Sequence, residues 1–271
     1  MPRIVMLTLV TLAFVLAQGR AEMIKKPVEY KDGDTVLEGY LAFDDLGIER
    51  RPGVLIVHEW WGLNDYAKQR ADQLAALGYV AFAVDMYGKG IRTTDRGEAG
   101  KLSGQFKDAP DKMRQRVRAG LDVLAKHERV DPQRIAAIGY CFGGTTVLQL
   151  AYSGAPVAGV VSFHGGLVPL PAADAKNVRA RILVLHGADD PFVPPAEIDA
   201  FQKSLREAKA DWQMMYYGNA VHSFTNPGAT GEIPGAQYEG NADRRSWQHM
   251  LGFLREVVGR APRASARPAG G

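Results

Sequence analysis

The chain has 271 residues, of which 46% are hydrophobic and 23% are charged, and its formal net charge is +3 at pH 7. These fractions are ordinary for a globular protein. So small a charge, without a Lys/Arg stripe on any predicted helix face, argues against nucleic acid as a partner. A single cysteine excludes an internal disulfide.

The first 21 residues differ from the rest of the chain. Arg3 precedes an apolar run at 4–16, and small residues follow that run. This order is typical of a secretory signal peptide, so we expect residues 1–21 to be removed after Gly19 or Ala21. The mature protein would then be periplasmic or secreted, without stable membrane insertion. The run is short for a transmembrane helix, and an uncleaved membrane anchor is the alternative.

Apolar runs and helical patterns alternate through the rest of the chain. The predicted strands are 35–43, 53–59, 79–85, 134–140, 157–165, 181–187 and 212–218, and the predicted helices are 64–78, 111–127 and 241–259. Most of these strands are almost continuously apolar, which indicates a mostly parallel sheet with helices on both faces. Segment 35–43 alternates more and suits an edge strand. We expect one α/β domain over 22–260 and a disordered tail over 261–271.

The predicted helix at 64–78 carries its own start and stop signals. Its apolar residues recur at a spacing of three and four, as on one buried face: Ala67, Ala71, Leu74 and Leu77. Asn64 is a candidate N-cap and Gly78 a candidate residue for the turn that ends the helix.

The only cysteine, Cys141, lies where the strand at 134–140 turns into a helical pattern. Gly139 and Gly143 flank it as G-x-C-x-G, the nucleophile elbow pattern with Cys in place of Ser. The tight corner needs small residues where strand and helix come close. A lone cysteine is also compatible with a buried small hydrophobic residue. Its place at the corner favours a reactive thiol at the start of a helix.

An elbow requires an acid and then a histidine later in the chain. The histidines that lie far enough beyond the cysteine are His186, His222 and His249. Asp189 and Asp190 follow the strand at 181–187, and we choose Asp190 because it enters an Asp-Pro turn. His222 lies in the loop after the last strand, whereas His249 lies inside a helical run. The expected triad is therefore Cys141, His222 and Asp190.

Five ordered segments make the chain resemble the dienelactone hydrolases, which have an α/β-hydrolase fold and a Cys-His-Asp triad. They are "HEWWGLND" (58–65), "DMYGKG" (85–90), "GYCFGG" (139–144), "HGADDPFVP" (186–194) and "HSFTNP" (222–227). The resemblance covers nearly all of the expected mature chain. It implies hydrolysis of an enol lactone or activated ester through a cysteine acyl-enzyme, without an external cofactor.

The resemblance also assigns roles around the thiol. It implies that Glu59 contacts the resting thiol and helps to ionise it when substrate binds. A carboxylate that pairs with a nearby base or caps the helix at 64 is the alternative. The expected oxyanion hole uses the backbone N–H groups of Trp60 and Phe142. Trp60 and Trp61 are expected either to wall the pocket or to fill the core.

Substrate recognition is where the chain departs from the family pattern. The family holds a substrate carboxylate with two arginines, near the tyrosine that corresponds to Tyr87 and after the base. Here those positions are Lys89 and Asn226. Lysine lacks the bidentate fork and asparagine lacks a charge, so we expect a weaker preference for anionic substrates. Arg92 or Arg96 would be the available substitutes.

The chemistry of a thiol narrows the expected reaction. A thiolate leaves a tetrahedral intermediate more easily than an alkoxide does, so enol lactones, aryl esters and thioesters suit it best. No trio of His, Asp and Glu has the spacing of a metal site. A general exported carboxylesterase or thioesterase is the alternative enzyme, and a non-catalytic binding protein is the alternative outside enzymes. The pattern does not predict an oligomeric state.

Overall fold

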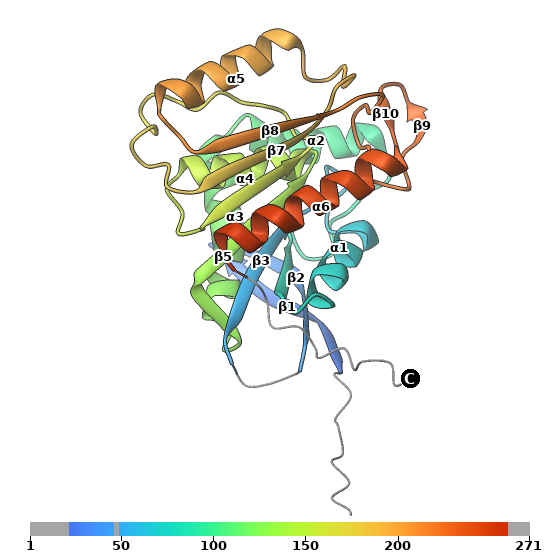
Figure 1. Ribbon diagram of the computed structural model, residues 1–271. Coiled ribbons are helices and arrows are strands. Elements are labelled where there is room, and N and C mark those ends of the chain that lie inside the picture. Colours follow the sequence, from blue (N-terminus) through green and yellow to red (C-terminus); the bar gives the residue numbers. More distant parts are fainter. Residues whose placement is uncertain (1–21, 46–48, 260–271) are drawn as a thin grey trace, which may run out of the picture.

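The computed structural model describes residues 22–45 and 49–259 (Figure 1). The expected signal peptide at 1–21 and the expected tail at 261–271 lie outside these residues. No helix within the two described ranges is long and apolar enough to cross a membrane.

An eight-stranded sheet forms the centre, in the order β1-β2-β4-β3-β5-β6-β7-β8. Its strands are β1 (Met23–Asp32), β2 (Thr35–Asp44), β3 (Arg51–Val57), β4 (Val80–Val84), β5 (Val130–Tyr140), β6 (Gly159–Phe163), β7 (Arg181–Gly187) and β8 (Trp212–Tyr217). Strands β3 to β8 run parallel, and β1 and β2 are antiparallel to their neighbours. The carboxyl ends of the parallel strands therefore lie along one edge, where open α/β sheets bind ligands.

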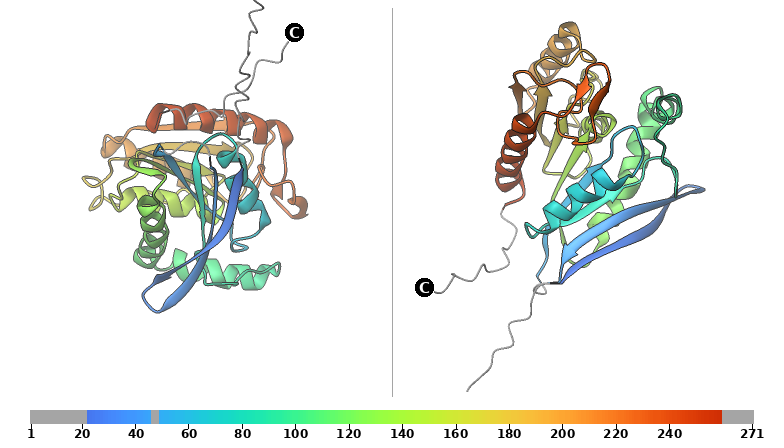
Figure 2. Two further views of the ribbon diagram at one scale, coloured as in Figure 1. Left: turned by 90° about the horizontal axis from the view of Figure 1, so that it is seen from below. Right: turned by 90° about the vertical axis from the view of Figure 1, so that its right-hand side faces the viewer.

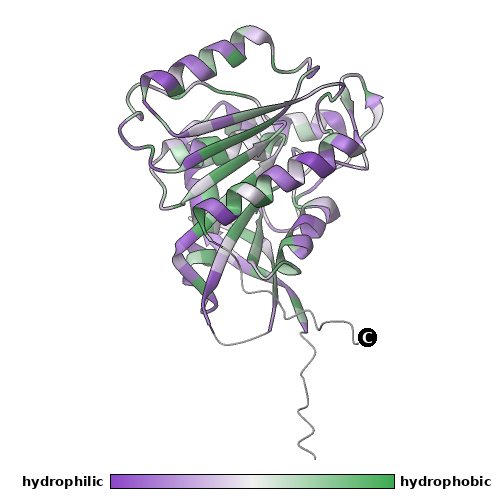
Figure 3. Ribbon diagram, viewed as in Figure 1, coloured by the Kyte–Doolittle hydropathy of each residue, from purple (hydrophilic) through white to green (hydrophobic). Residues whose placement is uncertain are grey.

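Helices cover both faces of this sheet (Figure 2). On one face lie α1 (Asp65–Ala75) and α6 (Gly240–Val257). The other face carries α2 (Arg96–Lys107), α3 (Pro110–Lys126), α4 (Phe142–Tyr152) and α5 (Pro195–Glu207). A short ribbon of β9 (Thr230–Ile233) and β10 (Ala236–Gln237) follows β8. Figure 3 shows the apolar strands between helices whose outer faces are polar, which confirms the expected layered α/β architecture.

One expectation about the sheet edge is wrong. Strand β2 is not an edge strand, because β1 pairs with its full length, from Met23 opposite Asp44 to Asp32 opposite Thr35. The charged sequence "MIKKPVEYKD" of β1 carries no buried apolar run and was not predicted as a strand. Its charges are those of an outer strand, which natural proteins use to prevent pairing between molecules.

Helix α1 confirms both capping predictions but not the full extent of its buried face. The side chain of Asn64 accepts a hydrogen bond from the backbone N–H of Ala67 at 3.4 Å. The helix ends at Ala75, three residues before Gly78, which adopts a φ of 90° in the turn that follows. Leu77 therefore lies beyond the helix and is 41% exposed, so its predicted place on the buried face is wrong.

Candidate active site

Cys141 occupies the sharp turn between β5 and α4. Its backbone has a φ of 53° and a ψ of −115°, a conformation that non-glycine residues rarely adopt. A Cβ atom on Gly139 would lie 2.0 Å from the carbonyl oxygen of Gly143. A Cβ atom on Gly143 would lie 2.2 Å from the carbonyl oxygen of Val57. The two glycines therefore let the strand and the helix meet closely enough to raise the thiol from the sheet, as the G-x-C-x-G pattern predicts.

The loop after β8 brings His222 to an acid from the end of β7. The Nδ1 atom of His222 lies 2.8 Å from Oδ2 of Asp190, whose side chain is fully buried. The other carboxylate oxygen of Asp190 accepts the backbone N–H of Phe192 at 2.9 Å. Asp189 is exposed and lies outside this arrangement. The structure thus places the buried Asp190, and not Asp189, against His222.

The charge state of His222 depends on two opposing influences. Burial lowers its pKa, while the negative charge of Cys141 and the hydrogen bonds to Asp190 and Cys141 raise it, to about 10 in balance. A protonated ring is therefore the favoured form of His222 near neutral pH.

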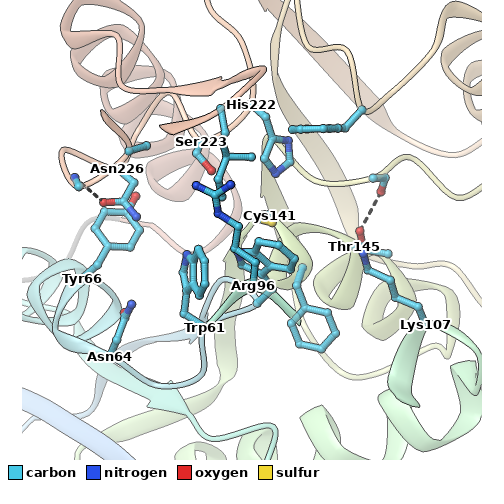
Figure 4. Close-up of a pocket in the computed structure, with 18 of the residues that line it drawn as sticks. Trp61, Asn64, Tyr66, Arg96, Lys107, Cys141, Thr145, His222, Ser223 and Asn226 are labelled. Carbon is cyan, nitrogen blue, oxygen red and sulfur yellow. Dashed lines mark hydrogen bonds between the residues drawn. The ribbon is translucent and has the colours of Figure 1, made fainter. Parts of the chain in front are cut away.

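A pocket of about 1360 Å³ lies at the carboxyl edge of the sheet, and Cys141 and His222 are among the residues that line it (Figure 4). Figure 4 shows His222 and Cys141 at its centre, with Trp61 and Tyr66 on the side of α1. Aromatic and aliphatic side chains make up much of the wall, which suits a substrate with a sizeable apolar part.

Glu59 lies behind the pocket and is almost fully buried. Its Oε2 accepts a hydrogen bond from the side-chain amide of Asn226 at 2.5 Å, and its Oε1 accepts one from the Ser223 hydroxyl at 3.3 Å. Burial raises the pKa of Glu59, against the lowering effect of Asn226, the charge of His222 and Ser223. The resemblance implied a contact between this carboxylate and the resting thiol. Its hydrogen bonds instead go to the loop that carries His222.

The structure separates the residues expected to bind substrate. Trp61 and Asn226 line the pocket, although the amide of Asn226 is engaged by Glu59. Tyr87 is buried behind the wall, where its hydroxyl donates to the carbonyl of Trp60 at 3.0 Å. Lys89 must be corrected, because its ammonium group pairs with Glu29 at 2.6 Å on the outer strands and does not reach the pocket.

Other positively charged side chains do line the pocket. Arg92, Arg96 and Lys107 line it, the last two from the ends of α2. Arg96 extends into the pocket in Figure 4, and its Nη2 donates to the carbonyl oxygen of Glu232 at 2.9 Å. Of these three, Lys107 was not singled out from sequence, because its helix was not predicted.

Two backbone N–H groups are available near the thiol. Neither the N–H of Trp60 nor that of Phe142 donates a hydrogen bond to any of the residues that the structure describes. Phe142 begins α4, so its N–H points from the positive end of a helix dipole. The two N–H groups therefore remain the candidate donors of an oxyanion hole.

A second histidine, His164, is hydrogen-bonded to the backbone of the turn that carries Cys141. The backbone N–H of Cys141 donates to Nδ1 of His164 at 3.2 Å and to the carbonyl of Phe163 at 3.0 Å. The Nε2 atom of His164 lies 2.7 Å from the hydroxyl of Thr225, which contacts the hydroxyl of Tyr66 at 2.6 Å. Burial holds the pKa of His164 well below its usual value. A neutral His164 thus connects the nucleophile to the loop of His222, a link that sequence spacing gave no means to detect.

No group of three or more metal-ligating side chains gathers among the described residues.

The chain is similar in sequence and in structure to known proteins. A model of the dienelactone hydrolase family matches residues 37–258. The chain is 30% identical to "Protein usf" of Aquifex pyrophilus over 238 residues, which cover 85% of this chain and 98% of that protein. It is 42% identical to a crystal structure described as a dienelactone hydrolase-like promiscuous phosphotriesterase from metagenomic libraries. That match covers 88% of this chain and 99% of the other, with a TM-score of 0.84.

A more distant structure bears on the fold alone. An alpha/beta hydrolase enzyme from a deep-sea metagenome library is 18% identical, with a TM-score of 0.59 over 86% of this chain and 98% of its own. The central sheet and its flanking helices therefore form an α/β-hydrolase fold.

Proposed function

This chain belongs to the dienelactone hydrolase family of hydrolases, and we propose that it opens enol lactones or activated esters through a cysteine acyl-enzyme. The observation that supports the proposal most directly is the placement of Cys141 on a strained elbow within a pocket that also contains His222. The hydrogen bond from His222 to Asp190 completes the arrangement of nucleophile, base and orienting acid.

The reaction follows from these positions. The thiol proton passes to Nε2 of His222, and the thiolate of Cys141 attacks the carbonyl carbon. Negative charge then develops on the carbonyl oxygen, where the N–H groups of Trp60 and Phe142 stabilise it. The C–O bond to the leaving group breaks, and His222 returns its proton to the departing oxygen. Water, deprotonated by His222, attacks the thioester, and the released thiolate restores the enzyme.

The leaving group limits which esters react. The first tetrahedral intermediate can expel either the thiolate or the substrate oxygen. A simple alkoxide is the poorer leaving group, so alkyl esters return to reactants. An enolate, a phenolate or a thiolate of a substrate thioester leaves readily. We therefore place enol lactones and aryl esters first, ahead of a general carboxylesterase activity.

A substrate panel tests the proposal. The protein would be assayed with an enol lactone, an aryl ester, an alkyl ester and a phosphotriester, before and after treatment with iodoacetamide. Because Cys141 is the only cysteine in the chain, labelling reports on this residue alone. We expect turnover of the first two substrates and its loss in labelled protein and in Cys141→Ala. Full activity of Cys141→Ala would exclude the cysteine mechanism, and no turnover of any substrate would favour a binding protein.

We also propose that the chain acts outside the cytoplasm, on the basis of its charged, apolar and small-residue N-terminal pattern. N-terminal sequencing of protein from the cell envelope or medium should start near Arg20 or Glu22. Recovery of the complete chain from the cytoplasm would contradict export.

A further inference from the structure

His58 follows β3 and is completely buried, and it is not part of the pocket wall. The proposed reaction does not use it. Its ring nevertheless lies between the two segments that supply the proposed oxyanion hole. It stacks on the ring of Phe142 at 6.0 Å between centroids and meets Tyr87 edge-on at 5.0 Å.

The hydrogen bonds of His58 define its tautomer. The backbone N–H of Met86 points at Nε2, at 3.3 Å. A peptide N–H can only donate, so Nε2 must carry a lone pair and the ring proton must lie on Nδ1. The Nδ1–H group donates to the carbonyl oxygen of Glu59 at 2.5 Å. Both ring nitrogens therefore have one assigned role.

This contact controls a peptide bond at the edge of the pocket. The carbonyl of Glu59 and the N–H of Trp60 belong to the same planar trans peptide and point in opposite directions. Holding the carbonyl toward His58 therefore directs the Trp60 N–H away from it. The backbone N–H of Gly62 donates to the same carbonyl at 3.4 Å, and the Tyr87 hydroxyl holds the next one.

We propose that His58 is a positioning residue that sets the oxyanion hole by locking the Glu59–Trp60 peptide. The inference rests on the proposed function, because it concerns the intermediate of that reaction. If the peptide turned over, the carbonyl oxygen of Glu59 would replace the N–H of Trp60 and would repel the developing negative charge. His58 also stacks on the ring of Phe142, the residue that supplies the second donor.

The surroundings of His58 keep it in the required neutral form. Burial lowers its pKa, and the Glu59 carbonyl and the charge of Asp85 offset only part of this effect. An imidazolium would carry a proton on Nε2 and would face the N–H of Met86, donor against donor.

Two variants separate positioning from a general structural role. His58→Leu removes the donor, whereas His58→Asn offers a side-chain N–H near the position of Nδ1. With an aryl ester, we expect His58→Leu to lower kcat by about 10²–10³, as removal of one oxyanion donor does, with little change in KM. His58→Asn should recover much of that loss. Alkylation of Cys141 by iodoacetamide needs no oxyanion hole, so its rate should stay within a few-fold of wild type in both.

The outcomes that overturn the proposal are distinct. An unchanged kcat in folded His58→Leu would exclude the lock. An alkylation rate that falls in parallel with kcat would show that His58 acts on the thiol instead.

A measurement on the wild-type protein tests the proposal even if His58→Leu does not fold. Nitrogen-15 NMR of the histidine rings should show His58 protonated on Nδ1 alone near neutral pH, and an Nε2–H ring or an imidazolium would overturn the inference. This readout does not require ester turnover. A protein with the Nδ1–H ring but no hydrolysis of any ester would refute the proposed function and leave the tautomer assignment standing.

Discussion

Asn226 donates a hydrogen bond from its side-chain amide to the buried carboxylate of Glu59. Glu59 follows β3, and Asn226 belongs to the loop that carries the proposed base, His222. The contact therefore ties two walls of the pocket together across the sheet edge. It also explains why Asn226 contributes no free amide to a substrate, although it lies at a position where the family resemblance implies an arginine.

Asn226→Asp should destabilise the protein more than Asn226→Ala. The aspartate would face Glu59 as a second buried carboxylate, whereas alanine only removes the donor, at a cost of about 1.5–3 kcal/mol for a hydrogen bond to a charged group. Burial raises the pKa of Glu59 above 4.5, so its protonated form favours folding and this contribution fades as the pH rises. The excess destabilisation of the aspartate variant should therefore grow from about pH 4.5 to neutral pH. Urea unfolding across that range measures it, and a pH-independent difference would contradict it.

His222 should make a pH-dependent contribution to stability. Its pKa in the folded protein, about 10, lies above the ordinary value of 6.5. Because the folded state binds the proton more tightly, the contribution is complete below pH 6.5 and is lost as the pH rises through about 10. The difference in unfolding free energy between wild type and His222→Gln should shrink in that window. In a Cys141→Ala background the window should move to lower pH, since the thiolate that raises the pKa is gone.

Thr225→Val should disturb the elbow from a distance, while Thr225→Ser should not. Valine removes the hydroxyl that accepts from Nε2 of His164, whose Nδ1 accepts the N–H of Cys141. A buried donor without a partner costs about 1–3 kcal/mol. We expect a lower melting temperature and slower alkylation of Cys141 by iodoacetamide in the valine variant, and near wild-type values for serine. Equal behaviour of the two variants would show that the hydroxyl is not required.

Two glycine substitutions should have opposite effects on the stability of the protein. Gly143→Ala forces a Cβ atom to within 2.2 Å of the Val57 carbonyl, so strand and helix must separate and both stability and ester turnover should fall. Gly100→Ala serves as the matched control within α2, where an added Cβ meets no atom within 4 Å. That change should stabilise the protein by about 0.4–1 kcal/mol. Thermal unfolding of both variants measures these changes. An unchanged melting temperature in Gly143→Ala would refute the close approach of strand and helix at the elbow.

Sequence patterns predicted the parts of this protein that depend on local chemistry. Six strands, β3 to β8, were found from apolar runs, because parallel strands buried on both faces are almost wholly apolar, and β2 was found from its more alternating pattern. The elbow was found from Gly139 and Gly143, since only small residues fit that corner. Strand β1 was missed because its stability comes from pairing with β2, and its charged side chains leave no apolar pattern.

The fine structure of the site could not be read in the same way. The partners of Glu59 lie more than 160 residues away in the chain, at Ser223 and Asn226. Which carboxylate oxygen meets which donor depends on how two loops pack in three dimensions. The prediction that Lys89 binds substrate failed for the same reason, because its ammonium group forms an ion pair with Glu29 on β1, a strand that was not predicted.

Arg96 should set the preference for negatively charged substrates. It lines the pocket at the start of α2 and extends into it, whereas Lys89 is held by Glu29 outside the pocket. A charge-assisted hydrogen bond to a substrate carboxylate contributes about 1.5–3 kcal/mol, and about 1.4 kcal/mol is tenfold in affinity. Arg96→Met should therefore raise KM for a carboxylated aryl ester about tenfold or more, and should leave KM for its neutral analogue nearly unchanged.

Lys89→Met is the matched control for this prediction. It also removes one positive charge, but from outside the pocket, so the ratio of kcat/KM between the two esters should stay at the wild-type value. An equal loss with Arg96→Met and Lys89→Met would point to long-range attraction by net charge, which added salt would screen. No change with Arg96→Met would shift the role to Arg92 or Lys107, the other cations on the pocket wall.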